Sequence, residues 1–329
     1  MCRRRLFWAG WIAAWGLAQL GAADHLLFIE AQGVGGYSFK AKEIQYYSQF
    51  ELETMQKPSL GFDYLQRISS PKRDIAILSV QTRLALDVQE KTKPEFQIYN
   101  AFLKFKTRQF DLWIGHNRPH FGLASRFDQH AHLLQPLVMN GFGFDRDWGI
   151  GLERQTADGD VGISLTTGSG MALRLRGGWL LAGRLAKGIL ENDNFNVGLS
   201  FGAGKILDVM GNNLLSETPR PIRMAELDMT WVRNNWENRL EIAIGDRRFG
   251  PMAAVLWRLG LGLLAENRLK LEVQPALFWE NDRENLQLST GLTLLANADW
   301  TFRAMYLYDR RNRDSRLVFQ IYFYKGLSI

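Results

Sequence analysis

Polar and apolar residues alternate along most of the chain. Within 298–308, Trp300 and Phe302 occupy one set of alternate positions, and Thr301 and Arg303 occupy the other. Successive side chains of a β-strand point to opposite faces of its sheet. The pattern therefore predicts strands that each have one apolar face and one polar face.

Sixteen segments show this alternation, and Asn-, Asp- or Gly-containing turns separate many of them. They predict an all-β fold, an antiparallel up-and-down barrel of about 16 strands. The predicted strands are 42–53, 60–69, 73–89, 94–106, 108–116, 147–157, 160–167, 171–189, 195–204, 222–233, 236–245, 252–265, 268–279, 284–295, 298–309 and 315–325.

The two faces indicate which solvent each side of the sheet meets. A barrel of this size with a dry centre would bury many charged side chains, such as Arg184, Arg258 and Glu272, at a prohibitive cost. A water-filled centre and a lipid-facing exterior remove that cost, and closure satisfies the backbone hydrogen bonds. Tryptophans and tyrosines near the strand ends fit interfacial girdles. The sequence thus predicts a transmembrane β-barrel in the outer membrane of a Gram-negative-type bacterium, with the lipid bilayer as a partner.

The first residues have the pattern of an export signal. Arg3, Arg4 and Arg5 precede an apolar run, and Gly21 and Ala23 fit a cleavage site, so we predict a signal peptide over 1–23. Without those arginines the formal charge of +6 becomes +3. The mixed charge predicts no nucleic-acid partner, and the single cysteine, Cys2, lies inside the signal.

The segment 24–40 contains the glycine-rich stretch 33–36 and could form a strand or a flexible lead-in. Outer-membrane barrels have an even number of strands, and short turns alternate with longer external loops. Counting back from the turn at Thr107 leaves no place for a further spanning strand. We therefore predict a periplasmic or lumen-docked lead-in at 24–40 and a barrel over 41–329.

The gap 117–146 is the longest connection, and it falls third among the external loops. The stretch from Asp111 to Gly122, Asp-Leu-Trp-Ile-Gly-His-Asn-Arg-Pro-His-Phe-Gly, resembles the end of a porin strand and the Pro-Phe-Gly-type turn of phosphate-selective-type porins. In general bacterial porins the third loop folds inward and narrows the channel. The resemblance implies the same role for 117–146, and porin trimers make a homotrimer an expectation.

Candidate channel residues follow from these predictions. Those expected at the constriction are Arg118, His120, Arg126, Asp128 and Asp145. Those expected on the pore wall are Arg83, Asp87, Arg174, Arg176 and Arg303. Arginines on a pore wall favour anions, yet acidic residues nearly balance them, so mixed lining without selectivity stays open. The Asp145-Arg-Asp147 run is either a charge gate or, more commonly for such runs, a solvated turn.

The best-supported function is passive diffusion of small hydrophilic solutes or anions, with no catalytic step and no cofactor. Two alternatives remain. A lipase-like barrel enzyme would use Ser125 with His130 or His132, and a structural or adhesive barrel would not conduct. His116 and His120 have a spacing that could suit a metal on a helix, but Pro119 lies between them, so we predict no metal site.

Overall fold

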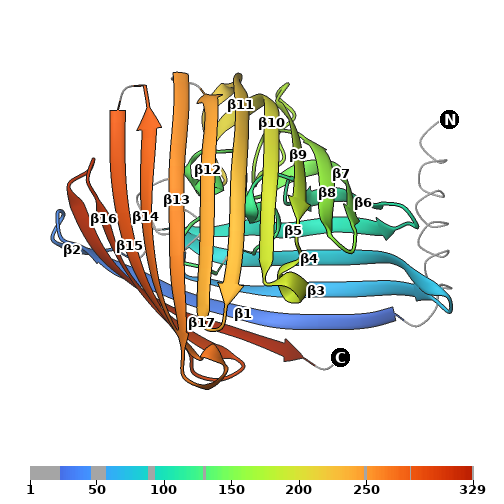
Figure 1. Ribbon diagram of the computed structural model, residues 1–329, viewed down its shortest axis with the longest axis horizontal. Helices are drawn as coiled ribbons and strands as arrows, with labels where there is room; N and C mark the ends of the chain where they lie inside the picture. Colours follow the sequence, from blue (N-terminus) through green and yellow to red (C-terminus); the bar gives the residue numbers. More distant parts are fainter. Residues whose placement is uncertain are drawn as a thin grey trace.

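The computed structural model describes residues 23–45, 57–87, 93–128, 131–247, 250–281 and 283–327. Within these residues, sixteen long strands and one three-residue strand form a single antiparallel sheet. The sheet closes on itself because the first strand pairs with the last (Figure 1). The predicted sixteen-stranded up-and-down barrel is confirmed.

The strands follow one another around the barrel in chain order. They are β1 (Ala23–Ser38), β2 (Glu43–Gln45), β3 (Ser59–Ser70), β4 (Arg73–Asp87), β5 (Lys93–Lys106), β6 (Asp111–Asn117), β7 (Asp147–Gln155), β8 (Gly159–Thr166), β9 (Trp179–Lys187), β10 (Phe195–Met210), β11 (Asn213–Arg233), β12 (Trp236–Arg247), β13 (Gly250–Leu263), β14 (Leu269–Glu280), β15 (Arg283–Leu295), β16 (Trp300–Asp309) and β17 (Asp314–Leu327). Short helical turns are α2 (Leu190–Asp193), η2 (Leu123–Ser125), η3 (Leu137–Asn140) and η4 (Ala265–Asn267). Within the described part of the chain, no helix has the length and apolar character needed to cross a membrane.

The prediction that 24–40 is a lead-in is wrong. β1 pairs with β17 from Leu27↔Leu327 to Ser38↔Arg316, and with β3 from Ala23↔Ile68 to Gln32↔Ser59. This strand joins the two edges of the sheet, so its backbone satisfies groups that lipid could not.

Of the predicted strand 42–53, the described residues contain the three-residue strand β2, and positions 46–56 lie outside them. The total stays at sixteen long strands because β1 takes the place assigned to that segment. The predicted signal peptide over 1–23 falls, apart from Ala23, outside the described residues.

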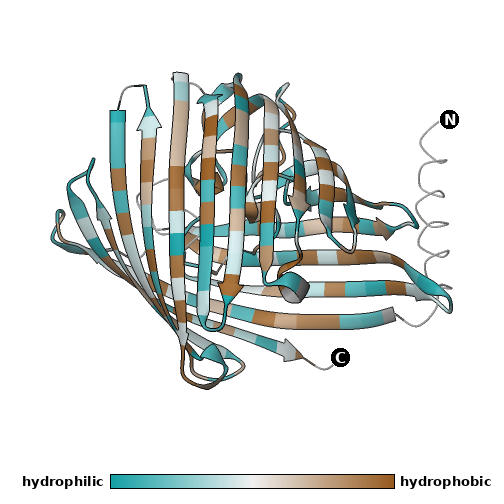
Figure 2. Cartoon of the chain, viewed as in Figure 1, coloured by the Kyte–Doolittle hydropathy of each residue, from teal (hydrophilic) through white to brown (hydrophobic). Residues whose placement is uncertain are grey.

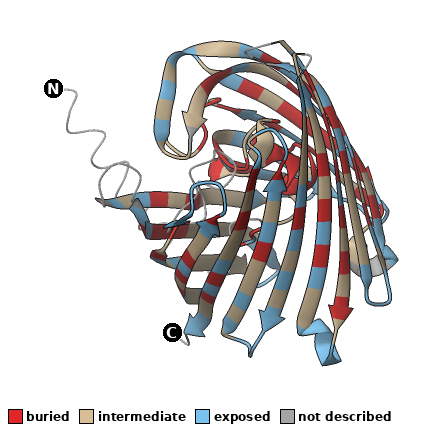
Figure 3. Ribbon diagram, turned by 90° about the vertical axis from the view of Figure 1, so that its left-hand side faces the viewer, coloured by how far each residue is buried: buried red, intermediate tan, exposed pale blue. Residues whose placement is uncertain are grey.

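Hydrophobic and hydrophilic residues alternate along many of the strands in Figure 2, as buried and more exposed residues do in Figure 3. On β4, Leu84 is 54% exposed, whereas its neighbour Arg83 is 1% exposed. Large exposed apolar side chains recur at alternate positions on most of the strands, and buried charged or amide side chains fall between them. In a closed barrel the first set faces outward and the second faces inward.

Two predicted strand boundaries differ from the structure. The connection 205–221, expected between the predicted strands 195–204 and 222–233, is instead the continuation of β10 and β11, which turn at Gly211 and Asn212. The expected strand 171–189 begins only at Trp179, because 167–178 leave the sheet. Leu173 and Leu175 alternate with arginines in that segment although it contains no strand, so alternation alone does not indicate one there.

The inner wall is not polar throughout. Between β9 and β14 it has an apolar zone of small and medium side chains, among them Ala182, Ala243 and Ala254. Phe121, Leu137 and Phe142, from the connection 118–146, are buried against this zone. The small residues on the wall leave space that these larger side chains fill.

Candidate functional site

The connection between β6 and β7, residues 118–146, is called the long loop here. Its two ends are joined by Asp128. One carboxylate oxygen of Asp128 lies 3.1 Å from Nη2 of Arg118, and the other lies 3.0 Å from Nη2 of Arg146. Arg118 begins the loop and Arg146 ends it, so one carboxylate links both ends.

Arg146 lies at the centre of a dense network. Its guanidinium pairs with Asp145, donates from Nε to Oδ1 of Asn100 at 3.2 Å, and lies 5.1 Å from the Tyr99 ring centroid. Burial disfavours its charge, but Asp145 and Asp128 together raise the pKa of Arg146. The guanidinium therefore stays charged although it is 1% exposed.

The interpretation of Asp145-Arg-Asp147 as a solvated turn is wrong, because the three residues are 6%, 1% and 0% exposed. Asp147 accepts hydrogen bonds from the backbone N–H groups of Gly168, Ser169 and Gly170. This carboxylate fixes the start of the next external connection to the end of the long loop. These three residues therefore hold the end of the long loop in place.

Contacts with the inner face of the barrel hold His120 in one orientation. Its backbone N–H donates to Oγ of Ser164 at 3.0 Å, and Trp113 donates from Nε1 to its Nε2 at 3.3 Å. A Cβ at Gly162 would lie 2.5 Å from Nδ1 of His120, so glycine at that position makes room for the ring. Burial lowers the pKa of His120 to about 4, against the opposing effect of Glu153 at 3.8 Å.

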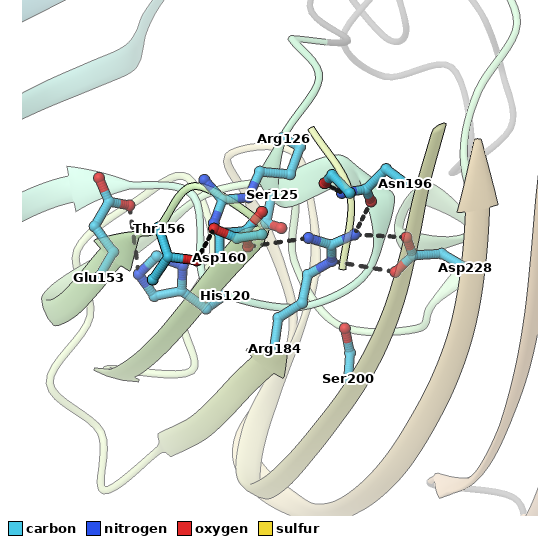
Figure 4. A network of polar contacts seen from close by, with 12 residues as sticks. His120, Ser125, Arg126, Glu153, Thr156, Asp160, Arg184, Asn196, Ser200 and Asp228 are labelled. Carbon is cyan, nitrogen blue, oxygen red and sulfur yellow. Dashed lines mark hydrogen bonds and ion pairs between the residues drawn. The ribbon is translucent and has the colours of Figure 1, made fainter. Parts of the chain in front are cut away.

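A chain of alternating charges runs from the long loop onto the wall (Figure 4). Arg126 pairs with Asp160 of β8, and Nη1 of Arg184 on β9 lies 3.3 Å from the same carboxylate. Arg184 also donates to Asp228 of β11, with Nη2 2.6 Å from Oδ1 and Nε 3.2 Å from Oδ2. This pair reaches across β10 above Gly198, where a Cβ would lie 2.3 Å from the guanidinium.

The loop backbone is also hydrogen-bonded to the wall. Gly122 N–H donates to Oγ of Ser200 on β10 at 3.0 Å, and Leu137 N–H donates to Oε2 of Glu241 on β12 at 3.2 Å. With the Ser164 contact, acceptors on three separated strands bind the loop. Side-chain acceptors of the inner face therefore determine the path of its backbone.

The predicted constriction residues are all in this loop network, but the predicted wall residues are not all on the wall. Arg83 is buried, donates from Nε to Gln97 at 2.7 Å and lies 4.4 Å from the Tyr99 ring centroid. Arg303 of β16 donates to Gln320 of β17 at 2.9 Å, a neighbour on the same inner face. Both side chains belong to the inner face, and their role in lining a pore stays a prediction.

The wall assignment is wrong for Arg174 and Arg176. Both fall in 167–178, where the chain has left the sheet, and Arg174 donates to the carbonyl oxygen of Asn212. Arg176 forms an exposed 2.9 Å ion pair with Glu217, on the extended part of β11. The side chain of Asp87 lies outside the described residues.

The residues considered for catalysis or metal binding have the following places in the structure. Ser125 donates from Oγ to the carbonyl oxygen of Gly122 at 2.8 Å, within its own turn. His130 lies outside the described residues, and burial together with the charge of Arg303 lowers the pKa of His132 to about 3. Across the described ranges, no group of three or more His, Cys, Asp or Glu side chains could hold a metal ion.

Four residues of the network were not predicted as site residues: Arg146, Asp160, Arg184 and Asp228. Arg146 had a visible signal, since it stands between two aspartates. The others had only their place on polar strand faces. Their meeting depends on strand register, which alternation does not give.

No protein-family model and no curated protein matches this chain. Solved structures do match. Salmonella typhi OmpF, in complex with daunomycin, has a TM-score of 0.64 at 9% identity, with 92% of this chain and 97% of that chain covered. The anion-selective porin from Comamonas acidovorans has a TM-score of 0.63 at 10% identity, with 93% of this chain and 100% of that chain covered.

OmpT of Vibrio cholerae, an outer membrane protein described in a trimer form, has a TM-score of 0.62 at 11% identity and covers 93% and 100%. Identities this low establish the fold. The chain thus has a porin-like β-barrel architecture, and the matches extend over nearly the whole length of each neighbour.

Proposed function

We propose that this protein is an outer-membrane channel for the passive diffusion of small hydrophilic solutes, narrowed by the long loop. One observation supports this most strongly. Side chains of β8, β10 and β12 that belong to the inner face bind the loop backbone, whereas the outward positions are large and apolar. A loop bound to the inner face reduces the cross-section of the barrel.

We further propose a preference for anions. Arg258 donates from Nε to Oε1 of Gln274 at 2.7 Å, and Arg303 donates to Gln320, so these hydrogen bonds use neutral acceptors. These two bonds do not pair the guanidinium with a carboxylate, whereas Arg239 forms an ion pair with Glu237. Cations on a pore wall that carboxylates offset only in part attract anions. The likeness to an anion-selective porin agrees with this proposal.

Planar-bilayer recording of the purified, folded barrel tests both parts. The diffusion channel predicts stepwise conductance, and the anion preference predicts a reversal potential of anion sign in a salt gradient. Arg303→Gln should move that potential toward cations, whereas the exposed Arg176→Gln should move it less. A folded barrel without conductance steps contradicts the channel and favours the non-conducting structural alternative.

The assembly and the enzyme alternative have direct tests. We propose a homotrimer, in line with the trimer form described for the Vibrio cholerae protein, and mass measurement in detergent checks it. The Ser125 hydroxyl hydrogen-bonds within its own turn. A non-enzymatic channel predicts equal, background lipid hydrolysis by the wild type and Ser125→Ala.

A further inference from the structure

The turn between β16 and β17 is strongly basic. Arg310, Arg311 and Arg313 fall within four successive positions of it, and all three are exposed. The turn between β1 and β2 adds Lys40 and Lys42, which are exposed as well. These five residues are called the basic rim here. Clustered cations on a protein surface create a positive potential that attracts anions.

Hydrogen bonds join the two turns of the basic rim (Figure 1). Nζ of Lys40 donates to the carbonyl oxygen of Asn312 at 2.8 Å, and the backbone N–H of Lys40 donates to Oδ1 of Asp314 at 3.2 Å. Within the arginine turn, the backbone N–H of Asn312 donates to Oδ1 of Asp309 at 2.9 Å. Asp309 and Asp314 are 8% and 5% exposed. These two buried carboxylates therefore hold the turns in place, while the basic side chains stay exposed.

Carboxylates balance the basic rim only in part. Nη1 of Arg310 lies 3.2 Å from Oε1 of Glu284, in a pair whose side chains are 63% and 54% exposed. Glu43 adds a second exposed carboxylate beside the rim. Arg311 and Arg313 form no ion pair with any carboxylate among the described residues. The rim therefore keeps a net positive charge that a bound anion can neutralise.

Aromatic side chains face outward one step further along the same strands. Tyr306 and Tyr308 of β16 are 39% and 37% exposed, and Tyr37 of β1 is 37% exposed. Strand register brings Tyr306 and Tyr37 to the same level, because both pair with Leu317 of β17. The Tyr306 hydroxyl donates to Oγ of Ser315 at 3.0 Å. Rings with a polar tip are typical of the membrane interface.

The outward side chains change character in a fixed order along these strands. Towards the middle of the barrel wall, Phe302, Phe319 and Ile321 are 40%, 55% and 49% exposed. In the other direction, Arg310 lies two positions after Tyr308, about 7 Å along the strand. The order is therefore apolar, aromatic and cationic. Acyl chains, interface and phosphate groups follow one another in the same order in a lipid leaflet.

The basic rim and the long loop lie at the same end of the barrel. Successive strands alternate in direction, so the connections that follow β6 and β16 leave the sheet at the same edge. Longer connections of an outer-membrane barrel are external. A lipid at the basic rim therefore belongs to the external leaflet.

We propose that the basic rim binds the phosphate groups of an anionic lipid in the external leaflet, with the acyl chains of that lipid against the outward face of β16, β17 and β1. Guanidinium groups bind phosphate oxygens in bidentate fashion. The aromatic and apolar rows give contact that a free phosphate ion cannot use, so the occupant is a lipid. The site lies on the outside of the barrel and needs no conducting channel, so it goes beyond the proposed function.

Lipid retention by the purified, folded barrel tests the site. The probe is lipid A, a phosphorylated glycolipid, and native mass spectrometry in detergent gives its dissociation constant. Arg311→Gln with Arg313→Gln should weaken binding about tenfold or more, because two phosphate-binding charges are lost. Arg154→Gln with Arg268→Gln is the matched control, since both arginines are exposed at the opposite end of the barrel. Equal binding by the two variants overturns the proposal.

Two further probes separate a lipid from other ligands. Dephosphorylated lipid A should bind the wild type as weakly as intact lipid A binds the rim variant. If it binds as tightly as lipid A, the phosphate groups contribute nothing and the proposal is overturned. Inorganic phosphate at the same concentration should not displace lipid A. Displacement would show a site for free anions and overturn the assignment to a lipid.

Folding and conductance are measured separately from lipid binding. β-sheet circular dichroism and heat-dependent mobility show that each variant is folded, and the replacement of Arg311 and Arg313 leaves the ion pair of Arg310 intact. A barrel that binds lipid A without conducting supports the lipid site and overturns the channel. A conducting barrel that does not bind it overturns the lipid site while the channel stands.

Discussion

Oδ1 of Asp128 lies 3.0 Å from Nη2 of Arg146, although 18 positions separate the two residues. The same carboxylate binds Arg118 through its other oxygen. The long loop is therefore closed at its base by an ion triad and held along its length by the inner wall. An arrangement of this kind gives the loop one path, which the proposed constriction requires.

The first prediction concerns that triad. Asp128→Asn should lower the unfolding free energy by about 1–2 kcal/mol, less than for a fully buried pair because the Asp128 side chain is 39% exposed. Denaturant titration in detergent measures it. Glu217→Gln, which breaks the exposed pair with Arg176, should change stability by less than about 0.5 kcal/mol. Equal effects of the two variants would show that the triad does not stabilise the loop.

The second prediction concerns the glycine beneath the Arg184–Asp228 pair. Gly198→Ala should destabilise the barrel by about 1–3 kcal/mol, because the new methyl group would lie 2.3 Å from Nη2 of Arg184 and 2.5 Å from Oδ2 of Asp228. Gly33→Ala is the control, since a Cβ there meets nothing within 4 Å. Thermal unfolding of both proteins gives the comparison. A Gly198→Ala barrel as stable as Gly33→Ala would contradict the close crossing of the ion pair over β10.

The third prediction concerns the aromatic anchor of the loop. Phe121 is 2% exposed in the apolar zone of the wall, so Phe121→Ala should weaken loop docking by about 3 kcal/mol through lost contact and a cavity. Hydrogen exchange of the loop amides should report this loss. Phe39→Ala, at a side chain that is 52% exposed, should leave the loop amides unaffected. Unchanged hydrogen exchange in Phe121→Ala would show that Phe121 does not stabilise the docked loop.

The fourth prediction concerns pH. Folding lowers the pKa of His120 to about 4 from an unfolded value of about 6.5. The unfolded chain therefore binds the proton first on acidification, so the stability contribution is complete above pH 6.5 and is lost as pH falls toward 4. The loss from this one group is at most about 3 kcal/mol.

Unfolding measured between pH 7.5 and 4 checks this expectation. His120→Asn should show a shallower decline over that window than the wild type. Burial lowers the pKa of His120, and the hydrogen bond from Trp113 acts in the same direction, because Nε2 can accept it only when that nitrogen is unprotonated. Identical pH profiles of the two proteins would show that His120 does not titrate as its surroundings indicate.

The sequence by itself determined the architecture, because successive side chains of a strand point to opposite faces. The polarity of alternate residues therefore indicates the environment of each face. Alternation such as Trp300 and Phe302 against Thr301 and Arg303 indicated both the strands and their faces. Where alternation occurred outside a strand, as at Leu173 and Leu175, it misassigned Arg174 and Arg176 to the wall. Where a strand was rich in glycine, as in β1, the pattern was too weak, and a parity argument gave the wrong segment.

Only the tertiary structure decided how the loop and the wall meet. Strand register placed Arg184 beside Asp160 and Asp228, and closure of the barrel brought Val34 of β1 to the same cluster as Met305 of β16. Local side-chain polarity gives the face of a strand but not its partner across the barrel. Contacts between distant segments are set by the registers of all the strands together, and therefore only by the complete fold.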